Sequence, residues 1–548
     1  MTIIVQHKKA RTFIIFLLLV AGYSGIAMRI YYVAIRDGST YAAMGQQQYY
    51  VTLTTYPPRA HIVDRHGQPL AINREGVSAF VTPATIHDRR ALERFLQEHY
   101  PHAYTRLHNA HDHHSFFIQR MLTDEQYACI RNAASKDIHL VNEPGRYYPL
   151  PVSAPIVGIT NSDGKGICGL ELFFNEQLAG KPMVQHLWKD AHSGVYTLPH
   201  QLPEQGVTGT ALVTSVDTVL QFLANEELLA TMREYQAREG AVIIVDPATG
   251  EVLAMVSQPW CDPHDRVGLE LEYMNNRIVH HQYELGSVIK VCSALAALEE
   301  GVVQPDELID CQGVRTTYIN GRKVNTAKKT EAGLIPFSRV IERSNNIGIA
   351  QVALRLGDQL YAHYQRMGFD RLTGIELPGE RSGFINPPHT WSKQSVISLS
   401  YGYEIASTLA QLARFFCMIA RDGHDLRLTL LKQPAAQQGE RTYSHQSIDT
   451  MRTILENTTL HGTTYRARIK GYTIMSKSGT ANMLVDGQYT PDKGTFTCAG
   501  IIQKGDYQRV MVVFIKEAVG QELFASVVAA PLFERIAQKI LIHDKILI

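Results

Sequence analysis

The chain has 548 residues, of which 45% are hydrophobic and 19% are charged, so it can bury the cores of about two to four domains. Its 53 Lys and Arg residues nearly balance its 52 Asp and Glu residues, which leaves a net charge of +1. This balance excludes the polycationic composition typical of nucleic-acid-binding proteins, and no block of like charges suggests a disordered tail. We therefore expect a folded protein with no nucleic-acid partner.

The N-terminus has the pattern of a membrane anchor. Lys8, Lys9 and Arg11 precede an apolar run over 12–28, which is near the shortest length that crosses a bilayer as a helix. Aromatic residues follow the run, as is common where a helix leaves the membrane. Because basic residues precede the run and no acid lies among them, we expect the N-terminus to lie in the cytoplasm.

These features divide the N-terminal region into three parts. We predict a cytoplasmic tail over 1–11, a single transmembrane helix over 12–35, and an extracytoplasmic remainder. The alternative is a cleaved signal peptide, with a weak small-residue site at Gly22-Tyr23-Ser24. Under either interpretation the rest of the chain is exported across that membrane.

The exported part divides near residue 225. Residues 36–225 read as a mixed, non-catalytic pedestal with short strands, turns and a helix near 91–99. Residues 226–548 begin with a strand, turn and strand and end with a second hairpin and a helix, and further helical stretches lie between. The predicted strands are 241–245, 251–256, 496–502 and 510–515, and the predicted helices are 288–298, 336–356, 408–419 and 526–542. Strands at both ends with helices between them indicate an α/β (α+β) domain around an antiparallel sheet.

The first chemical motif is Ser287-Val288-Ile289-Lys290. On a helix, residues three apart share a face, so Lys290 could reach the Ser287 hydroxyl. A serine needs an adjacent base to act as a nucleophile, and a lysine can be that base if burial or a nearby cation lowers its pKa. Alone, the spacing is weak, and a helix start with a solvated lysine is the more common explanation.

The second motif is Ser344-Asn345-Asn346, which opens an apolar helical stretch. Its structural interpretation is a helix N-cap or a turn. Its functional interpretation makes Ser344 a proton shuttle and Asn346 the group that holds a substrate amide.

The third motif is Lys477-Ser478-Gly479-Thr480, after a β-like segment. A glycine on an edge strand lets a ligand backbone come close, and an extended substrate can add to such an edge. Lys477 and the hydroxyls of Ser478 and Thr480 suit an incoming carboxylate. The three motifs together, in this order, are typical of β-lactamases and penicillin-binding proteins.

With these motifs the chain resembles the class B penicillin-binding proteins over most of its length. The resemblance also covers an Arg-Ala-His-Ile-Val-Asp-Arg-His-Gly segment, a Gly-rich stretch, the entry to the catalytic region and a Ser-Tyr-Gly-Tyr landmark, which are 59–67, 158–171, 214–221 and 400–403. It implies an N-terminal transmembrane helix, an elongated pedestal of the dimerisation type and a penicillin-recognising transpeptidase domain. Length, short pedestal and single anchor are most similar to the division-specific transpeptidases of the FtsI family.

The resemblance also implies an activity and partners. D-Ala-D-Ala stem peptides of peptidoglycan would be the substrates, and β-lactam antibiotics would acylate the same serine. The region before residue 225 is short for a glycosyltransferase domain, so a separate membrane protein would polymerise the glycan, together with divisome proteins. Ser287, Lys290, Ser344, Asn346 and Lys477 would be catalytic, and the substrate-binding residues would be Ser478, Gly479 and Thr480.

The implied mechanism is an acyl transfer. Ser287 attacks the penultimate D-Ala carbonyl, Lys290 accepts its proton, and Ser344 helps pass a proton to the leaving D-Ala. The backbone N–H groups of Ser287 and Thr480 would form the oxyanion hole. This chemistry needs no metal or organic cofactor, and we expect neither. A histidine cluster could bind zinc, but its spacing is not diagnostic of a zinc site. Its members are His108, His111, His113 and His114.

Four departures from the family pattern put local loop shape in doubt. They are Ala60 and Glu404 for glycine, and Leu285 and Leu409 for proline. The seven cysteines contain no Cys-x-x-Cys; buried free thiols are favoured over a bridge such as Cys261 with Cys311.

Other functions share some of these features. An elongation-specific transpeptidase is the neighbouring alternative. A serine β-lactamase usually also needs a base for its deacylating water, and we find no Glu-x-x-Leu-Asn segment after Ser344. A β-lactam sensor should carry more membrane spans, a D,D-carboxypeptidase would release D-Ala to water, and a non-enzymatic divisome scaffold should have lost motif residues.

Overall fold

The computed structural model describes residues 2–109, 115–133, 135–161, 163–189, 196–197, 206–265, 270–326, 333–485, 488–520 and 523–546. The chain forms two compact units. The first unit contains residues 1–59 and 179–209, and the second contains residues 60–178 and 210–548. Each unit therefore combines segments that are distant in the sequence.

The first unit begins with a long apolar helix. The helix α1 is followed by a π-helical turn, the helix α2 and an antiparallel sheet of order β1-β6-β7. The helical segment 9–36 is long and apolar enough to cross a membrane, and none of its most apolar stretch is buried within the protein. A single-pass anchor is consistent with this helix, although a signal sequence has the same properties. The bounds are α1 Thr2–Ile30, the π turn Tyr31–Arg36, α2 Gly38–Tyr49, β1 Tyr50–Thr55, β6 Met183–Lys189 and β7 Tyr196–Thr197.

The N-terminal part of the second unit is a small sheet covered by helices. Its order is β4-β3-β2-β8, with β5 paired to β3, and β2 runs parallel to β8. The helix α3 confirms the helix predicted near 91–99, and Asp88 caps it by accepting from the Ala91 N–H. The bounds are β2 Ile62–Val63, β3 Pro69–Val81, α3 Arg89–His99, α4 Pro101–Asn109, β4 Phe116–Gln119, α5 Asp124–Asn132, β5 His139–Tyr147, α6 Ala154–Val157, α7 Gly169–Phe173, α8 Asn175–Ala179 and β8 Leu212–Val213.

The C-terminal part of the second unit is built on a five-stranded antiparallel sheet of order β10-β9-β19-β18-β17. The predicted antiparallel sheet between helices is therefore confirmed. The strands are β9 Glu239–Val245, β10 Val252–Gln258, β17 Thr473–Val485, β18 Gln488–Lys504 and β19 Tyr507–Lys516. The last of the order, β17, is an edge strand, which leaves one side of it open for another chain to pair with.

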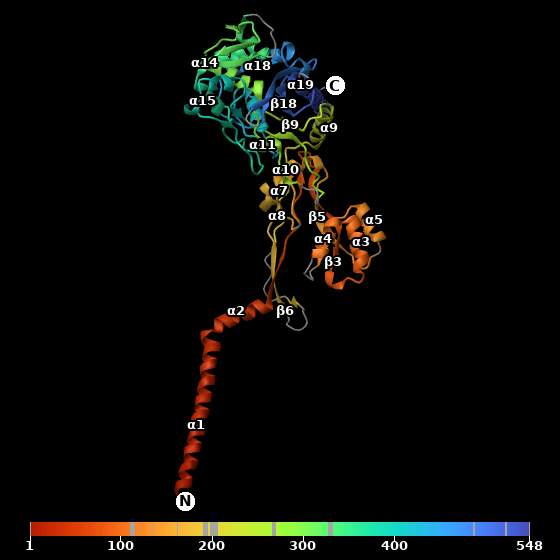
Figure 1. Cartoon of the computed structure of the whole chain (residues 1–548), viewed down its shortest axis with the longest axis vertical. Coiled ribbons are helices and arrows are strands. Elements are labelled where there is room, and N and C mark those ends of the chain that lie inside the picture. Colours follow the sequence, from red (N-terminus) through yellow and green to blue (C-terminus); the bar gives the residue numbers. More distant parts are fainter. Residues whose placement is uncertain are drawn as a thin grey trace. The chain divides into compact units, whose positions relative to one another are not determined.

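Alternation along the strands divides the core into two layers. On β9, Val242 and Ile244 pack with α9 and α19, whereas Ala241, Ile243 and Val245 pack on the opposite face with α17. Figure 1 shows α9 and α19 close to the strands β9 and β18. The bounds are α9 Thr218–Glu234, α17 Leu409–Ala420 and α19 Ala525–His543. The predicted domain boundary at residue 225 falls inside α9; the ranges 36–225 and 226–548 stay a prediction.

The remaining helices and small hairpins surround the second layer. Their bounds are α10 Leu271–Met274, α11 Arg277–His280, the 3-10 turn η4 Gly286–Ile289, α12 Lys290–Glu299, β11 Leu308–Asp310, β12 Thr316–Ile319, β13 Arg322–Asn325, β14 Leu334–Pro336, α13 Phe337–Glu342, α14 Asn346–Leu356, α15 Gln359–Arg366, β15 Phe384–Ile385, α16 Ser395–Ser400, β16 Ile405–Ala406 and α18 His445–His461.

Two of the predicted helices need correction, and both changes occur at the motifs. The stretch predicted as one helix over 336–356 is broken at Ser344, where φ is +57°, and continues as α14 because the Asn345 side chain caps it. The helix predicted over 288–298 is regular only from Lys290, and Ser287 lies in the preceding 3-10 turn. In such a turn residues three apart eclipse each other, so the shared face survives although the helix type differs.

Candidate active site

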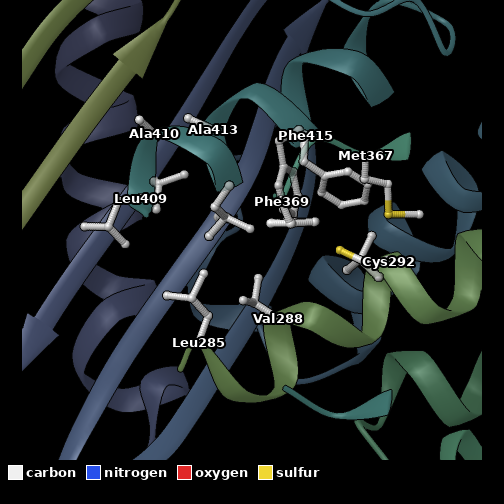
Figure 2. Close-up of a cluster of buried hydrophobic side chains, with 14 of the residues drawn as sticks. Leu285, Val288, Cys292, Met367, Phe369, Leu409, Ala410, Ala413 and Phe415 are labelled. Atoms are coloured by element: carbon white, nitrogen blue, oxygen red, sulfur yellow. The ribbon is translucent and has the colours of Figure 1, made fainter. Parts of the chain in front are cut away.

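The turn that carries Ser287 is fixed by buried neighbours on both sides. Leu285 and Val288 are 1% and 0% exposed, and Figure 2 shows them in a cluster with Leu409 and Phe415 of α17. Two of the family departures, Leu285 and Leu409, thus lie in one apolar core. The Ser287 side chain is only half-buried, so a rigid turn presents a reachable hydroxyl.

The edge strand β17 packs directly against this turn. A Cβ atom added to Gly479 would lie 2.3 Å from the Leu285 carbonyl oxygen and 2.8 Å from the Val288 nitrogen. The sequence argument assigned Gly479 to the close approach of a ligand; in the structure, the backbone of the Ser287 turn itself already requires a glycine. The third motif is thereby held beside the first.

Both motif lysines are buried and meet at one hydroxyl. Lys290 and Lys477 are each 0% exposed. The Lys290 ammonium nitrogen lies 3.0 Å from Ser344 Oγ and donates to the Ser344 carbonyl at 2.6 Å. Lys477 Nζ lies 3.0 Å from the same Oγ and donates to the Ser478 carbonyl at 2.9 Å. Ser344 Oγ therefore bridges two amines from distant parts of the chain.

Burial changes the proton affinity of both amines. Burial, and then the nearby Lys477 charge, lowers the pKa of Lys290 well below its ordinary value. Burial lowers the pKa of Lys477 to about 7. Two ammonium groups around one hydroxyl in a dry site repel each other, so the arrangement favours one neutral amine, which can serve as a base, and one cation.

The structure differs from the sequence expectation at the Ser287 hydroxyl. We expected Lys290 to reach it, but this hydroxyl makes no hydrogen bond within the described part of the chain, and Lys290 instead bonds Ser344. Nucleophile–base contacts are often long in the absence of substrate and tighten when substrate binds. The turn geometry keeps Ser287 and Lys290 one 3-10 turn apart, on the same side.

The second motif combines its structural and functional interpretations. Asn345 is the N-cap, accepting from the Ile347 and Gly348 N–H groups. This cap holds Ser344 in the left-handed conformation, which non-glycine residues rarely adopt and which is common at functional sites. Asn346 is half-buried and its Nδ2 donates to the Asn325 carbonyl oxygen at 2.5 Å; that it holds a substrate amide stays a prediction.

The hydroxyls of the third motif have structural partners as well. Thr480 Oγ1 accepts from the Ala525 N–H at 2.9 Å, at the start of α19, which leaves its proton free to be donated to a ligand. Ser478 Oγ lies 3.5 Å from Thr463 Oγ1. The structure thus brings all eight predicted residues to one region between η4, the start of α14 and β17.

Sequence reasoning missed the polar groups that hold β17 in place. Ser476 Oγ lies 2.8 Å from both Thr459 Oγ1 and Thr464 Oγ1, and all three side chains are buried. Such a network rigidifies a strand because each hydroxyl would be costly to leave unpaired. No spacing in the sequence could reveal it, because Thr459 lies in α18, Ser476 in β17 and Thr464 in the segment between them.

Other predictions concern groups outside this region. All seven cysteines are free, so the suggested Cys261–Cys311 bridge is wrong and buried or half-buried thiols are confirmed. Of the histidine cluster, His111, His113 and His114 lie outside the described residues. Within the part that is described, no three His, Cys, Asp or Glu side chains come together as a metal site.

Two family models match this chain. The family model of the penicillin binding protein transpeptidase domain matches residues 240–538, and that of the penicillin-binding protein dimerisation domain matches residues 54–214. Peptidoglycan D,D-transpeptidase FtsI of Escherichia coli K12 is 30% identical over 489 residues, which cover 87% of this chain and 82% of the relative. The probable peptidoglycan D,D-transpeptidase PbpC of Pseudomonas aeruginosa is 26% identical over 97% of this chain and 94% of its own.

Solved structures share the fold. The transpeptidase domain of Burkholderia pseudomallei penicillin-binding protein 3 matches with a TM-score of 0.54 and 27% identity, covering 61% of this chain and 96% of its own. Penicillin binding protein 3 of Mycobacterium tuberculosis, complexed with aztreonam, matches with a TM-score of 0.67 and 24% identity, over 90% of this chain and 98% of its own.

Proposed function

Because the chain belongs to the class B penicillin-binding proteins and is a peptidoglycan D,D-transpeptidase, we propose that its acyl-enzyme forms on Ser287 and that its product is septal cell wall. Peptidoglycan and β-lactams are the ligands of this class. The observation that supports the site is the Ser344 hydroxyl, which lies 3.0 Å from each of two fully buried amines beside the Ser287 turn.

The proposed reaction begins at the Ser287 hydroxyl. Lys290, as the neutral amine, takes the hydroxyl proton while Ser287 Oγ attacks the carbonyl carbon of the penultimate D-Ala. The backbone N–H groups of Ser287 and Thr480 stabilise the oxyanion; one such donor is typically worth about 100- to 1,000-fold in turnover. The proton then passes through Ser344 to the leaving D-Ala nitrogen, and an amine from a neighbouring peptide resolves the ester.

Substrate binding uses the other motif residues. Lys477, as the cation, and the hydroxyls of Ser478 and Thr480 receive the terminal carboxylate, because charge-assisted hydrogen bonds are the strong ones. The peptide backbone pairs with the open edge of β17 at Gly479, and Asn346 holds a substrate amide.

The test of this assignment is covalent labelling. Fluorescent penicillin should label the wild-type chain but not Ser287→Ala, while Ser287→Ala keeps the thermal stability of the wild type. Persistent labelling of Ser287→Ala at the same stoichiometry would show that another residue is the nucleophile.

We place the enzyme in septal synthesis on its resemblance to the division-specific FtsI family, whose name the Escherichia coli relative carries. The helix over 9–36 would be a single-pass anchor in the inner membrane, with the N-terminus in the cytoplasm and the catalytic domain outside. A separate glycan-polymerising membrane protein and divisome proteins would be its partners.

Localisation and complementation test this cellular role. A fluorescent fusion should concentrate at midcell, and the wild-type gene should rescue a strain depleted of its own division transpeptidase. Sidewall fluorescence without rescue would favour the elongation-specific alternative, and rescue by Ser287→Ala would favour a non-enzymatic scaffold.

A further inference from the structure

A small hairpin outside the three motifs is attached to the site from two directions. The strands β12 and β13 carry Arg322 and Asn325 at the two ends of β13. The Asn325 carbonyl accepts from Asn346 of the second motif, and Arg322 Nε donates to the Tyr401 hydroxyl at 3.0 Å. Arg322 therefore lies at the rim of the same region as the motif residues.

The loop that receives Arg322 touches the nucleophile turn. A Cβ atom added to Gly402 would lie 2.2 Å from the Gly286 carbonyl oxygen, so this loop packs directly on the residue before Ser287. The Glu404 N–H donates to the Glu284 carboxylate at 3.0 Å, three residues before Ser287. Arg322 and Glu404 thus face each other beside the acyl-transfer site.

Arg322 and Glu404 form only a long, partly exposed ion pair. Arg322 Nη1 lies 3.7 Å from Glu404 Oε1, beyond hydrogen-bonding distance, and the two side chains are 25% and 32% exposed. Neither terminal NH2 group of Arg322 donates a hydrogen bond within the described parts of the chain. The guanidinium fork is therefore available to a carboxylate, and an ion pair of this length and exposure is easily exchanged for one with a ligand.

The backbone of Glu404 has an unusual conformation. Its φ is +62°, in the left-handed region that favours glycine. A carboxylate kept in a strained backbone at the rim of an active site suggests a functional constraint.

The charges at this rim differ from those at the motif residues. The motif residues include the buried amines of Lys290 and Lys477, whereas the rim has one guanidinium with two carboxylates, those of Glu404 and Glu284. A group that carries both a carboxylate and an ammonium matches this rim, because the fork binds the carboxylate and the carboxylates bind the ammonium.

We propose that Arg322 and Glu404 form a specificity subsite for a stem-peptide side chain that ends in an ammonium and a carboxylate on one carbon. The subsite rests on the proposed function, since it selects among substrates of the Ser287 reaction. Such an end group can belong to the donor peptide or to the acceptor peptide, and the chemistry that recognises it is the same.

The experiment compares two synthetic D-Ala-D-Ala peptides with the full-length chain in detergent. One peptide has the zwitterionic end group, and the other has lysine at that position, which lacks the carboxylate. Each preparation is first titrated with labelled penicillin, so that rates refer to enzyme that forms the ester. The wild type should favour the zwitterionic peptide by about tenfold in kcat/KM, the effect of one charge-assisted contact.

In Arg322→Gln and in Glu404→Gln this ratio should fall towards one, mainly through KM. Arg441→Gln, which removes a more exposed arginine (42% against 25% for Arg322) paired with Asp422 elsewhere, should keep the wild-type ratio. Placing the end group on the donor alone or on the acceptor alone tells which strand uses the subsite, and a fall in either arm supports it.

A ratio near one in the wild type, or an unchanged ratio in both penicillin-titrated variants, overturns the subsite while leaving the Ser287 assignment intact. Failure of the wild type to be labelled by penicillin overturns the proposed function and the subsite together. The two failures are therefore distinguishable.

Discussion

At the scale of single residues, Lys477 is the group whose charge should control substrate binding. Its pKa is about 7 because burial disfavours the ammonium. Below that pH it is a cation and attracts a carboxylate; as pH rises through about 7 it loses the proton and the attraction. We expect the second-order rate of acylation by benzylpenicillin to fall by about tenfold or more between about pH 6 and about pH 9.

The methyl ester of the same penicillin is the matched control. It lacks the carboxylate, so its slower acylation should not fall over this pH range. A parallel fall for both compounds would assign the titration to the acylation step and not to Lys477.

The burial of Lys290, which the proposed reaction needs, should lower the stability of the folded protein. Burial lowers its pKa, so the unfolded chain binds more protons at this residue than the folded chain does. Stability of the wild type therefore rises with pH from the lowered pKa up to the ordinary value of 10.5. Lys290→Met removes this cost, and we expect it to abolish penicillin labelling but to keep or raise Tm.

The Tm difference between Lys290→Met and the wild type should be larger at about pH 6 than at about pH 9, since the cost disappears as pH rises. Lys539→Met, which removes a lysine paired with Glu227 on the surface of α19, should show no such gain. A Tm difference that is independent of pH would mean that packing, and not proton linkage, sets the stability of the site.

At the scale of elements, the contact between β17 and η4 should be as important as any side chain. A methyl group at Gly479 would meet backbone atoms of the Ser287 turn at 2.3 and 2.8 Å, and neither atom can rotate away. We expect Gly479→Ala to reduce penicillin acylation by about 100-fold or more, because a displacement of about 1 Å at a reacting centre can cost this much.

Gly494→Ala on the neighbouring strand is the control. Its added Cβ would lie 3.3 Å from the Ala481 carbonyl oxygen, which needs a shift of only a few tenths of an ångström, so we expect a far smaller loss of acylation than for Gly479→Ala. Near-wild-type acylation by Gly479→Ala would show that β17 can move without disturbing Ser287.

Sequence periodicity was sufficient for most elements but not for their interruptions. The predicted strands 241–245 and 510–515 and the helix over 408–419 correspond to β9, β19 and α17, because short continuous apolar runs and a Thr408–Gln411 capping box specify them locally. The break at Ser344 escaped prediction although the polar residues 342–346 interrupt the apolar pattern there. Its left-handed backbone depends on the Asn345 cap and on contacts with two distant lysines.

At the scale of the whole molecule, the apolar N-terminal helix and the candidate site belong to different compact units. We expect a chain that begins at residue 37 to leave the membrane fraction yet still be labelled by penicillin at Ser287, because the site lies wholly in the second unit. Fractionation followed by labelling checks this. Loss of labelling would mean that residues 1–36 are needed for the second unit to fold or act.

The mass of the mature protein separates the two interpretations of the apolar helix. A retained anchor predicts that residues 9–36 are present in the membrane-bound protein, whereas a signal peptide predicts a new N-terminus after the small-residue site near 22–24. We expect the intact form.

The sequence by itself determined the chemistry: a serine with a lysine three residues on, a Ser-x-Asn turn and a Lys-Ser-Gly-Thr strand are local patterns whose residue types suit acyl transfer. It also indicated the antiparallel sheet, because short apolar runs are joined by turn residues in two hairpins. Only the tertiary structure decided that Ser344 bridges both amines, that Gly479 accommodates the nucleophile turn, and that Arg322 faces Glu404. At Ser344 alone, the contacts join residues that lie 54 and 133 positions apart in the sequence. Contacts between residues so far apart are fixed by the packing of the whole chain and not by any local propensity.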